Sequence, residues 1–280
     1  MTDSTERRVK QKTADASEQL RMKQKMISLI DLTTLDKEKD TEEKVAQLVE
    51  NGSAKNALGT EVAAVCVYPE FVQAAKRKIA KLEKDAKGMR VATVVNFPSG
   101  DAQTSEAVAE TRAALQVGAD EIDLVICFKD YLSNAESPKS CEMVRQVKAA
   151  IEQNKKGNCL LKVILETGEL KCEHLIKKAS LDALDNGADF IKTSTGKTPT
   201  GATLAAAQTM LEAIKARNHQ SGLKISGGVR THEDALGYLQ LVETVLGPKA
   251  KEFLRPESFR FGVSGLLTNL LQETEVNTSY

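Results

Sequence analysis

Short apolar runs alternate with segments of helical period along most of the chain. The runs are near-continuous rather than alternating, as expected for parallel strands that are covered on both faces. Each run is followed by a segment whose apolar residues recur at the spacing of an amphipathic helix. The pattern predicts eight strands, at residues 26–32, 62–68, 90–95, 121–127, 159–165, 188–193, 222–226 and 259–263.

Two helix starts can be located from residue spacing. Asp40 with Glu43 three residues later resembles a capping box, in which two side chains satisfy free amides at a helix N-terminus. Thr231 with Asp234 has the same spacing and predicts a second helix start.

The repeated strand–helix pattern predicts a single (β/α)8 TIM barrel over residues 26–280, ending in a mobile C-terminal tail. No polar linker or break in composition divides this stretch. An open doubly wound sheet stays the alternative, because strand order cannot be read from one sequence. Residues 1–25 are rich in charge and poor in apolar side chains, which predicts a short N-terminal extension that is either mobile or helical.

Composition narrows the functional classes. Of the 280 residues, 41% are hydrophobic and 28% charged, which is typical of a globular protein with a sizeable core. The 39 basic residues balance the 39 acidic ones, so no net field recruits nucleic acid or an acidic membrane. The apolar runs are far shorter than the ~20 residues a bilayer requires. The first 25 residues are mostly polar, unlike a secretory leader. We therefore expect a soluble cytoplasmic protein with small-molecule partners.

Cysteine and histidine usage gives no metal signature. The five cysteines include no CxxC pair, so neither a disulfide framework nor a zinc knuckle is indicated. Cys172 and His174 form a C-x-H pair without two further ligands nearby in sequence, which is a weak zinc signal. We expect no metal, although a carboxylate-only site stays open.

An internal repeat places an acid and an amine at matched positions. Residues 118–123 and 187–192 share a Gly-Ala-Asp entry into a strand, which puts Asp123 and Lys192 five residues after the glycine. These are the fourth and sixth predicted strands, and alternate strands of a barrel contribute side chains to the same interior layer. The carboxylate and the amine are therefore expected to face each other inside the barrel.

Three consecutive predicted strands each contain a lysine, at Lys162, Lys192 and Lys224. One such lysine could extend its amine to solvent at a strand end or pair structurally with an acid. Three in succession, with Asp123 at a matched offset, favour a catalytic role. A lysine desolvated beside a second cation loses its proton more readily and becomes a nucleophile toward carbonyls. Lys192 and Lys224 are the natural pair.

The loops after the last three predicted strands favour an anion. Residues 193–198 (TSTGKT) offer hydroxyls, a flexible backbone and a cation, and Gly227-Gly228 and residues 262–265 (GVSG) each precede a helix. Barrel enzymes commonly bind phosphate with the loops after strands 7 and 8 and a helix N-terminus. These loops predict a phosphorylated substrate.

Six motifs occur in an order that resembles deoxyribose-phosphate aldolase, a class I aldolase family that works through a lysine Schiff base. The match runs from about residue 22 to the C-terminus, and its most specific block is FIKTSTGK. The motifs are residues 31–35 (DLTTL), 96–98 (NFP), 166–170 (ETGEL), 190–197 (FIKTSTGK), 227–230 (GGVR) and 260–262 (RFG).

The resemblance implies a reaction and three catalytic residues. The reaction is reversible cleavage of 2-deoxy-D-ribose 5-phosphate to acetaldehyde and D-glyceraldehyde 3-phosphate, without a cofactor, in deoxyribonucleotide catabolism. Lys192 matches the Schiff-base lysine, Lys224 the second lysine that depresses its pKa, and Asp123 the acid of the proton relay. The resemblance also suggests a homodimer.

Further positions of the family map to the substrate. Gly265 stands where a serine is common, so we expect somewhat weaker phosphate binding. Two rival functions stay open: another phosphate-binding barrel enzyme, such as a different Schiff-base aldolase or an isomerase, and a non-catalytic sugar-phosphate sensor. The implied binding residues are Lys197, Gly196, Gly227, Gly228, Ser264 and Gly265 for phosphate, Asp31 and Cys66 for the substrate cavity, and Tyr280 in the tail.

Overall fold

The computed structural model describes residues 16–154, 158–218 and 220–277, and these form a closed barrel of eight parallel strands. The strands pair in chain order, and the last pairs with the first, which excludes the open doubly wound alternative. They are β1 (Ile30–Thr33), β2 (Ala64–Val67), β3 (Arg90–Val95), β4 (Glu121–Val125), β5 (Leu160–Ile164), β6 (Phe190–Lys192), β7 (Gly222–Ser226) and β8 (Phe259–Val263).

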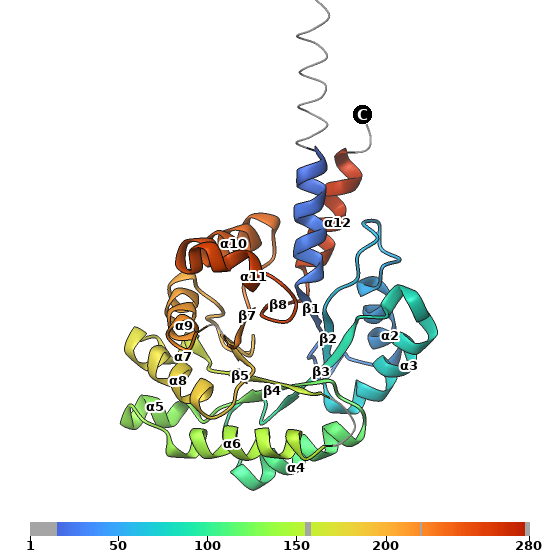
Figure 1. The fold of residues 1–280 in the computed structure, drawn as a ribbon. Helices are drawn as coiled ribbons and strands as arrows, with labels where there is room; N and C mark the ends of the chain where they lie inside the picture. The colour runs from blue at the N-terminus through green and yellow to red at the C-terminus, as the bar shows by residue number, and fades with distance from the viewer. Residues whose placement is uncertain (1–15, 155–157, 219, 278–280) are drawn as a thin grey trace, which may run out of the picture.

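Helices form a ring around these strands (Figure 1). Besides a helix over residues 16–28, they are α2 (Glu42–Gly52), α3 (Val72–Leu82), α4 (Thr104–Gln116), α5 (Phe128–Asn134), α6 (Pro138–Glu152), α7 (Thr167–Leu170), α8 (Glu173–Asp185), α9 (Leu204–Ala216), α10 (His232–Leu246), α11 (Ala250–Phe253) and α12 (Leu266–Asn277). Short 3₁₀ turns are η1 (Pro69–Phe71), η2 (Glu83–Ala86) and η3 (Gly247–Lys249). Within the described residues, no helix is long and apolar enough to span a bilayer.

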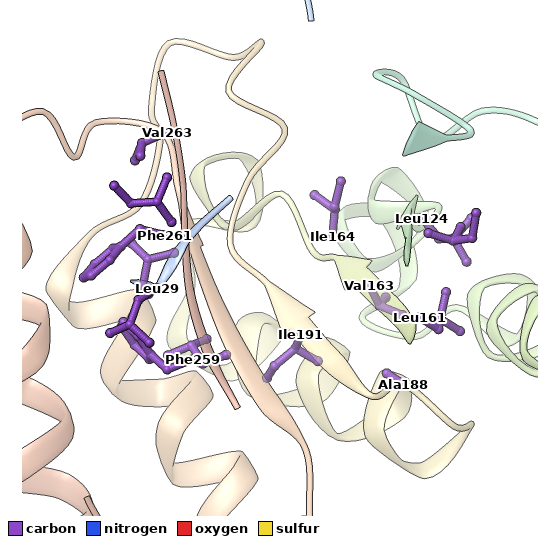
Figure 2. Packing of buried hydrophobic residues seen from close by; sticks show 14 of the residues in the cluster. Leu29, Leu124, Leu161, Val163, Ile164, Ala188, Ile191, Phe259, Phe261 and Val263 are labelled. Atoms are coloured by element: carbon purple, nitrogen blue, oxygen red, sulfur yellow. The ribbon is translucent and has the colours of Figure 1, made fainter. Parts of the chain in front are cut away.

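The main core lies between the barrel and its helices. Alternate strand residues pack outward into it, as the two-residue period of a strand requires. Figure 2 shows part of this layer, with Val163 on β5, Ile191 on β6, and Phe259 and Phe261 on β8. The two phenylalanine rings meet edge to face, with centroids 5.0 Å apart. The helices cover the outward-facing residues of each strand. The strand residues that alternate with these outward ones point into the barrel.

All eight predicted strands occur in the structure, and the largest difference in position is at the first of them. Three predicted strands have the observed bounds, and four others are two or three residues too long. The first prediction, 26–32, is wrong at its start, because residues 26–28 end the helix over 16–28 and β1 begins at Ile30. Met26 and Ile27 are fully buried, and a short buried apolar run does not by itself distinguish helix from strand.

One predicted cap is confirmed and the other is wrong. Thr231 and Asp234 form a capping box at the start of α10. At the start of α2 the cap is Thr41, whose side chain accepts a hydrogen bond from the Lys44 amide. The Asp40 carboxylate instead accepts a hydrogen bond from the Thr34 hydroxyl, 2.6 Å away, and stabilises the loop after β1.

The ends of the chain fall partly outside the described residues. Residues 16–25 are helical and continue to residue 28, so the expected boundary at residue 26 lies inside this helix. Residues 1–15 and Tyr280 lie outside the described part, and α12 ends at Asn277.

Candidate active site

A layer of buried charged side chains fills the interior of the barrel. Each of its members comes from a different position on the inward face of β1, β4, β5, β6, β7 or β8, and each is at most 2% exposed. Salt bridges connect all of them, including pairs on strands that are not neighbours, which requires that they meet across the barrel interior. The members are Asp31, Glu121, Asp123, Lys162, Lys192, Lys224 and Arg260.

Asp123 is the hub of this layer. Its Oδ2 accepts hydrogen bonds from Lys192 Nζ at 2.8 Å and from Lys224 Nζ at 2.7 Å. Its Oδ1 accepts one from Lys162 Nζ at 3.1 Å. The matched offsets in β4 and β6 therefore bring Asp123 and Lys192 together, as the internal repeat predicts, and both other strand lysines join them.

Arg260 anchors the deeper side of the layer. Its guanidinium bridges two acids, donating to Asp31 Oδ1 and, at 2.9 Å, to Glu121 Oε1. Asp31 also lies 2.6 Å from Lys224 Nζ through its Oδ2, and Glu121 pairs with Lys162. Neither Glu121 nor Arg260 is among the site residues predicted from the sequence. Their signal is the same as that of the lysines, a charged residue within an otherwise apolar strand.

The charges of this layer do not balance if every group is ionised. Three carboxylates face four cationic groups, so the loss of one proton from one amine makes the layer neutral. Lys192 is the amine whose positive charge is stabilised by the fewest carboxylate contacts. It contacts one carboxylate oxygen and shares that oxygen with Lys224, whereas Lys162 and Lys224 each contact two or more acids.

The pKa directions agree with this count. Burial lowers the pKa of the Lys192 ammonium, Asp123 opposes the shift, Lys224 adds to it, and the resulting pKa lies below that of an ordinary lysine. Burial would also lower the pKa of Lys224, but Asp123 and Asp31 outweigh it and raise that pKa. Burial would raise the pKa of Asp123, but Lys162, Lys192 and Lys224 hold it well below the usual range. The arrangement therefore favours a neutral Lys192 beside an ionised Asp123.

A cavity of about 570 Å³ opens at the carboxyl ends of the strands. It brings together the loops after β6, β7 and β8, as the sequence predicts for an anion site. The implied phosphate residues that line it are Gly196, Lys197, Gly227, Gly228, Ser264 and Gly265.

Backbone geometry explains two of these glycines. Gly227 and Gly228 have φ values of 80° and 93°, a region that favours glycine. The carbonyl carbon of Gly227 lies 2.6 Å from where a Cβ at Gly201 would stand, so the loops after β6 and β7 pack backbone against backbone.

Three cations line the cavity. Lys197 donates from Nζ to the carbonyl oxygen of Leu35, 2.5 Å away in the loop after β1. Arg230 and Lys44 also line it, and neither is among the site residues predicted from the sequence. Arg230 could have been found, since it ends the GGVR motif. Lys44 has no such motif and is paired with Asp40 at 2.7 Å.

The remaining implied residues are placed as follows. Asp31 is part of the buried charged layer. Cys66 is fully buried on β2, close enough to Lys192 and Lys224 to interact electrostatically, and burial raises the pKa of its thiol. Tyr280 lies outside the described residues. Throughout residues 16–154, 158–218 and 220–277, no cluster of three or more histidine, cysteine, aspartate or glutamate residues is arranged to hold a metal ion.

Comparison with known families gives one match over most of the chain. The model of the DeoC/LacD family of aldolases matches residues 25–247.

Solved structures resemble the whole barrel. A chain from Toxoplasma gondii ME49, provisionally named a deoxyribose-phosphate aldolase and crystallised in its apo form, is 27% identical, with a TM-score of 0.79 over 92% of this chain and 98% of that one. A chain from Coccidioides immitis with the same provisional name is 26% identical, with a TM-score of 0.72 over 90% of this chain and 86% of that one. The tetrameric deoxyribose phosphate aldolase of Aeropyrum pernix, 23% identical with a TM-score of 0.67 over 93% and 98%, shows the shared fold.

Proposed function

This chain belongs to the DeoC/LacD family of aldolases and is therefore a lyase, and from that premise we propose that it reversibly cleaves 2-deoxy-D-ribose 5-phosphate. The products are acetaldehyde and D-glyceraldehyde 3-phosphate. The observation that carries the proposal is the buried Lys192 amine, which shares one oxygen of Asp123 with Lys224. The cavity with three cations, and the names of the Toxoplasma gondii and Coccidioides immitis chains, support a phosphorylated deoxy sugar as substrate.

The first step is attack on the aldehyde. Neutral Lys192 adds to C1 of the open-chain sugar, and loss of water gives a protonated imine. This imine withdraws electrons from C2 far better than the aldehyde does, which is why a covalent lysine lowers the barrier to carbon–carbon cleavage. Burial and the positive charge of Lys224 lower the pKa of Lys192, so at any given pH a larger fraction of this amine is neutral than of an ordinary lysine.

Cleavage and release follow on the same lysine. The C3 hydroxyl loses its proton to the Asp123 carboxylate through a water, the C2–C3 bond breaks, and its electron pair moves to the enamine on Lys192. D-Glyceraldehyde 3-phosphate leaves. Protonation of the enamine at C2 and hydrolysis of the imine then release acetaldehyde and regenerate the amine. The Lys224 ammonium lies 2.7 Å from Asp123 Oδ2, and this contact supports a part for Lys224 in the proton transfer.

Trapping with borohydride tests the proposal directly. Incubation with acetaldehyde and sodium borohydride, followed by intact-mass measurement and peptide mapping, should give one ethyl adduct, on Lys192. An adduct on Lys162 or Lys224 would keep the reaction class and move the nucleophile. A folded protein with no specific adduct would contradict the Schiff-base mechanism. A substrate panel with a chelator present separates this reaction from other aldol cleavages and from metal-dependent ones.

Replacement of Lys224 by methionine is expected to raise the pKa of Lys192. The substitution removes the neighbouring positive charge and leaves Asp123 to stabilise the Lys192 ammonium more strongly. The reactive form is the neutral amine, which forms as the pH rises through this pKa. The acid limb of the kcat/KM profile should therefore move upward by roughly one to two pH units. A profile that coincides with that of the parent enzyme would show that Lys224 does not tune Lys192.

Replacement of Gly265 by serine is expected to strengthen phosphate binding. A Cβ at Gly265 would have no heavy atom within 4 Å. Gly265 lines the cavity at the carboxyl ends of the strands and directly precedes α12. The new hydroxyl can donate to the phosphate, so KM for the phosphorylated substrate should fall about three- to tenfold with little change in kcat. Gly265→Ala is the matched control, because it adds the Cβ without the hydroxyl. An equal fall of KM in both variants would contradict the proposed donor.

Several expectations from the sequence stay predictions. They are the absence of a cofactor, the role in deoxyribonucleotide catabolism, the cytoplasmic location and the homodimer. Sedimentation of the purified chain tests the last of these.

A further inference from the structure

Glu166 is a buried acid that the proposed mechanism does not use. It lies two residues after the end of β5, is fully buried, and has a φ of 56° and a ψ of 58°. A non-glycine residue in this left-handed region is uncommon, and such conformations persist only where the surroundings hold them. Glu166 also begins the ETGEL motif, which has so far been given no role.

The contacts of its carboxylate all lead to one loop, the loop after β6. Both of its oxygens accept from the Thr195 amide at 3.3 Å. Oε2 also accepts from the Thr195 hydroxyl, and Oε1 from the Thr198 hydroxyl at 3.3 Å. Among the residues that the structure describes, no salt bridge pairs this carboxylate with a cation. Burial raises the pKa of this carboxyl, although these hydrogen bonds and, to a smaller extent, the positive charge of Lys192 oppose the shift.

A buried carboxylate held by neutral donors alone carries a desolvation cost that a neutral side chain at this position would avoid. In exchange for this cost, the carboxylate holds the loop after β6 in position. An ionised carboxylate only accepts hydrogen bonds, so the Thr195 hydroxyl must use its one proton toward Glu166. Its lone pairs then remain to accept the Lys197 amide, which lies 3.0 Å away. One continuous chain of hydrogen bonds thus runs from Glu166 through Thr195 to the backbone of Lys197.

The Lys197 end of this series of hydrogen bonds lies in the cavity at the carboxyl ends of the strands. Gly196, between Thr195 and Lys197, has a φ of 76°, and the Lys197 side chain reaches across to the Leu35 carbonyl oxygen. Thr195, Gly196 and Lys197 all line the cavity. The conformation that presents Gly196 and Lys197 to an anion is thus fixed at its base by Glu166.

We propose that Glu166 is the positioning residue of the phosphate loop, and that through Thr195 it gives the enzyme its preference for phosphorylated over unphosphorylated aldehydes. This inference rests on the proposed function and names the residue that would set substrate selectivity at the same site. Among the described residues Glu166 makes no hydrogen bond or salt bridge with Lys192 or Asp123, and the charge of Lys192 affects the pKa of Glu166 less than the hydrogen bonds from Thr195 and Thr198 do. The larger effect of Glu166 should therefore fall on phosphate binding rather than on imine chemistry.

The test compares two substrates in Glu166→Gln. The amide keeps the shape of the carboxyl but has one acceptor oxygen in place of two and no charge. KM for 2-deoxy-D-ribose 5-phosphate should rise about tenfold or more, and competitive inhibition by inorganic phosphate should weaken in parallel. The kcat/KM for unphosphorylated 2-deoxy-D-ribose should fall by a much smaller factor. Glu169→Gln, on the same short helix α7, is the matched control and should leave both substrates unchanged.

A second pair of variants keeps the inference testable if Glu166→Gln does not fold. Thr195→Val removes the hydroxyl relay and should reproduce the loss of selectivity, and Thr195→Ser keeps the hydroxyl and should restore it. If the two substrates lose activity equally in Glu166→Gln and in Thr195→Val, the inference is wrong. Borohydride trapping of acetaldehyde on Lys192 separates this outcome from failure of the proposed function, because acetaldehyde carries no phosphate.

Discussion

Replacement of Lys192 by methionine is expected to abolish turnover while leaving the barrel folded. Methionine fills most of the volume of the lysine stem, and Asp123 keeps hydrogen bonds from Lys162 and Lys224, so no buried carboxylate is left without a partner. Without the amine no imine forms, and the electron sink for cleavage is lost. Activity in a coupled assay for D-glyceraldehyde 3-phosphate should fall at least about 10⁴-fold, and the borohydride adduct with acetaldehyde should disappear.

Lys162→Met is the matched control for this loss. Lys162 is also fully buried and contacts the same aspartate, but through Oδ1, on the side away from Lys192. Its replacement disturbs the charged layer without removing the proposed nucleophile. The Lys162 variant should therefore still give the ethyl adduct on Lys192, even if it turns over slowly. Retention of substantial cleavage activity in Lys192→Met would remove Lys192 from its assigned role.

The sequence is sufficient to predict most of the strands and helices of this fold. The strand runs are apolar, and the segments between them have helical period, so the strands and helices could be predicted, whereas the order of the strands in the sheet and the closure of the barrel come from the structure. The first strand could not be delimited in this way. Met26 and Ile27 end a helix that packs on the same core, and an apolar run of this length is compatible with either structure.

Some contacts of the site could likewise be predicted from the sequence and others could not. The contact of Asp123 with Lys192 was predictable because an internal repeat set both residues at one offset. The contribution of Glu121 and Arg260 was not, because the pairing of β8 with β4 across the barrel depends on closure and on the tilt of the strands. No local pattern in either strand indicates which charges meet, and Lys44 reaches the cavity only through the path of the loop after β1.

The charged layer also shows why one lysine of three is suited to be the nucleophile. All three are buried, so burial alone does not select among them. Selection comes from the number of acids that each amine contacts, and Lys192 contacts the fewest. Asp31 and Glu121 stabilise the charged forms of Lys224 and Lys162, which leaves Lys192 as the amine that loses its proton at the lowest pH. The deeper acids thus contribute to reactivity without contacting Lys192.

Replacement of Arg260 by methionine is expected to give the largest loss of stability among single substitutions in this layer. The guanidinium bridges Asp31 and Glu121, and its removal leaves both carboxylates fully buried with one cation fewer. Breaking a buried ion pair by removing one partner costs about 3–5 kcal/mol in the free energy of unfolding. Denaturant unfolding followed by circular dichroism measures this loss.

Arg217→Met is the control that isolates burial. Arg217 makes an equally direct two-pronged contact, donating to both oxygens of Asp185 at 2.6 Å, but its side chain is 41% exposed and that of Asp185 48% exposed. Water screens this pair, so the loss of the ion pair should lower the free energy of unfolding by no more than about 1 kcal/mol. Equal losses in the two variants would contradict the view that the Arg260 bridge is needed because its acids are desolvated.

The pH dependence of the Arg260 variant gives a second check. Burial would raise the pKa of Asp31, but Lys224, Arg260 and Lys162 outweigh it and hold that pKa below its ordinary value of 3.8. In the parent protein the ionised form is therefore stabilised by folding, and this contribution is present above pH 3.8 and is lost as the pH falls below it. Without Arg260 the pKa of Asp31 should rise, so that protonation relieves the buried charge at a higher pH. The difference in unfolding free energy between parent and variant should accordingly be largest near neutral pH and should narrow on acidification.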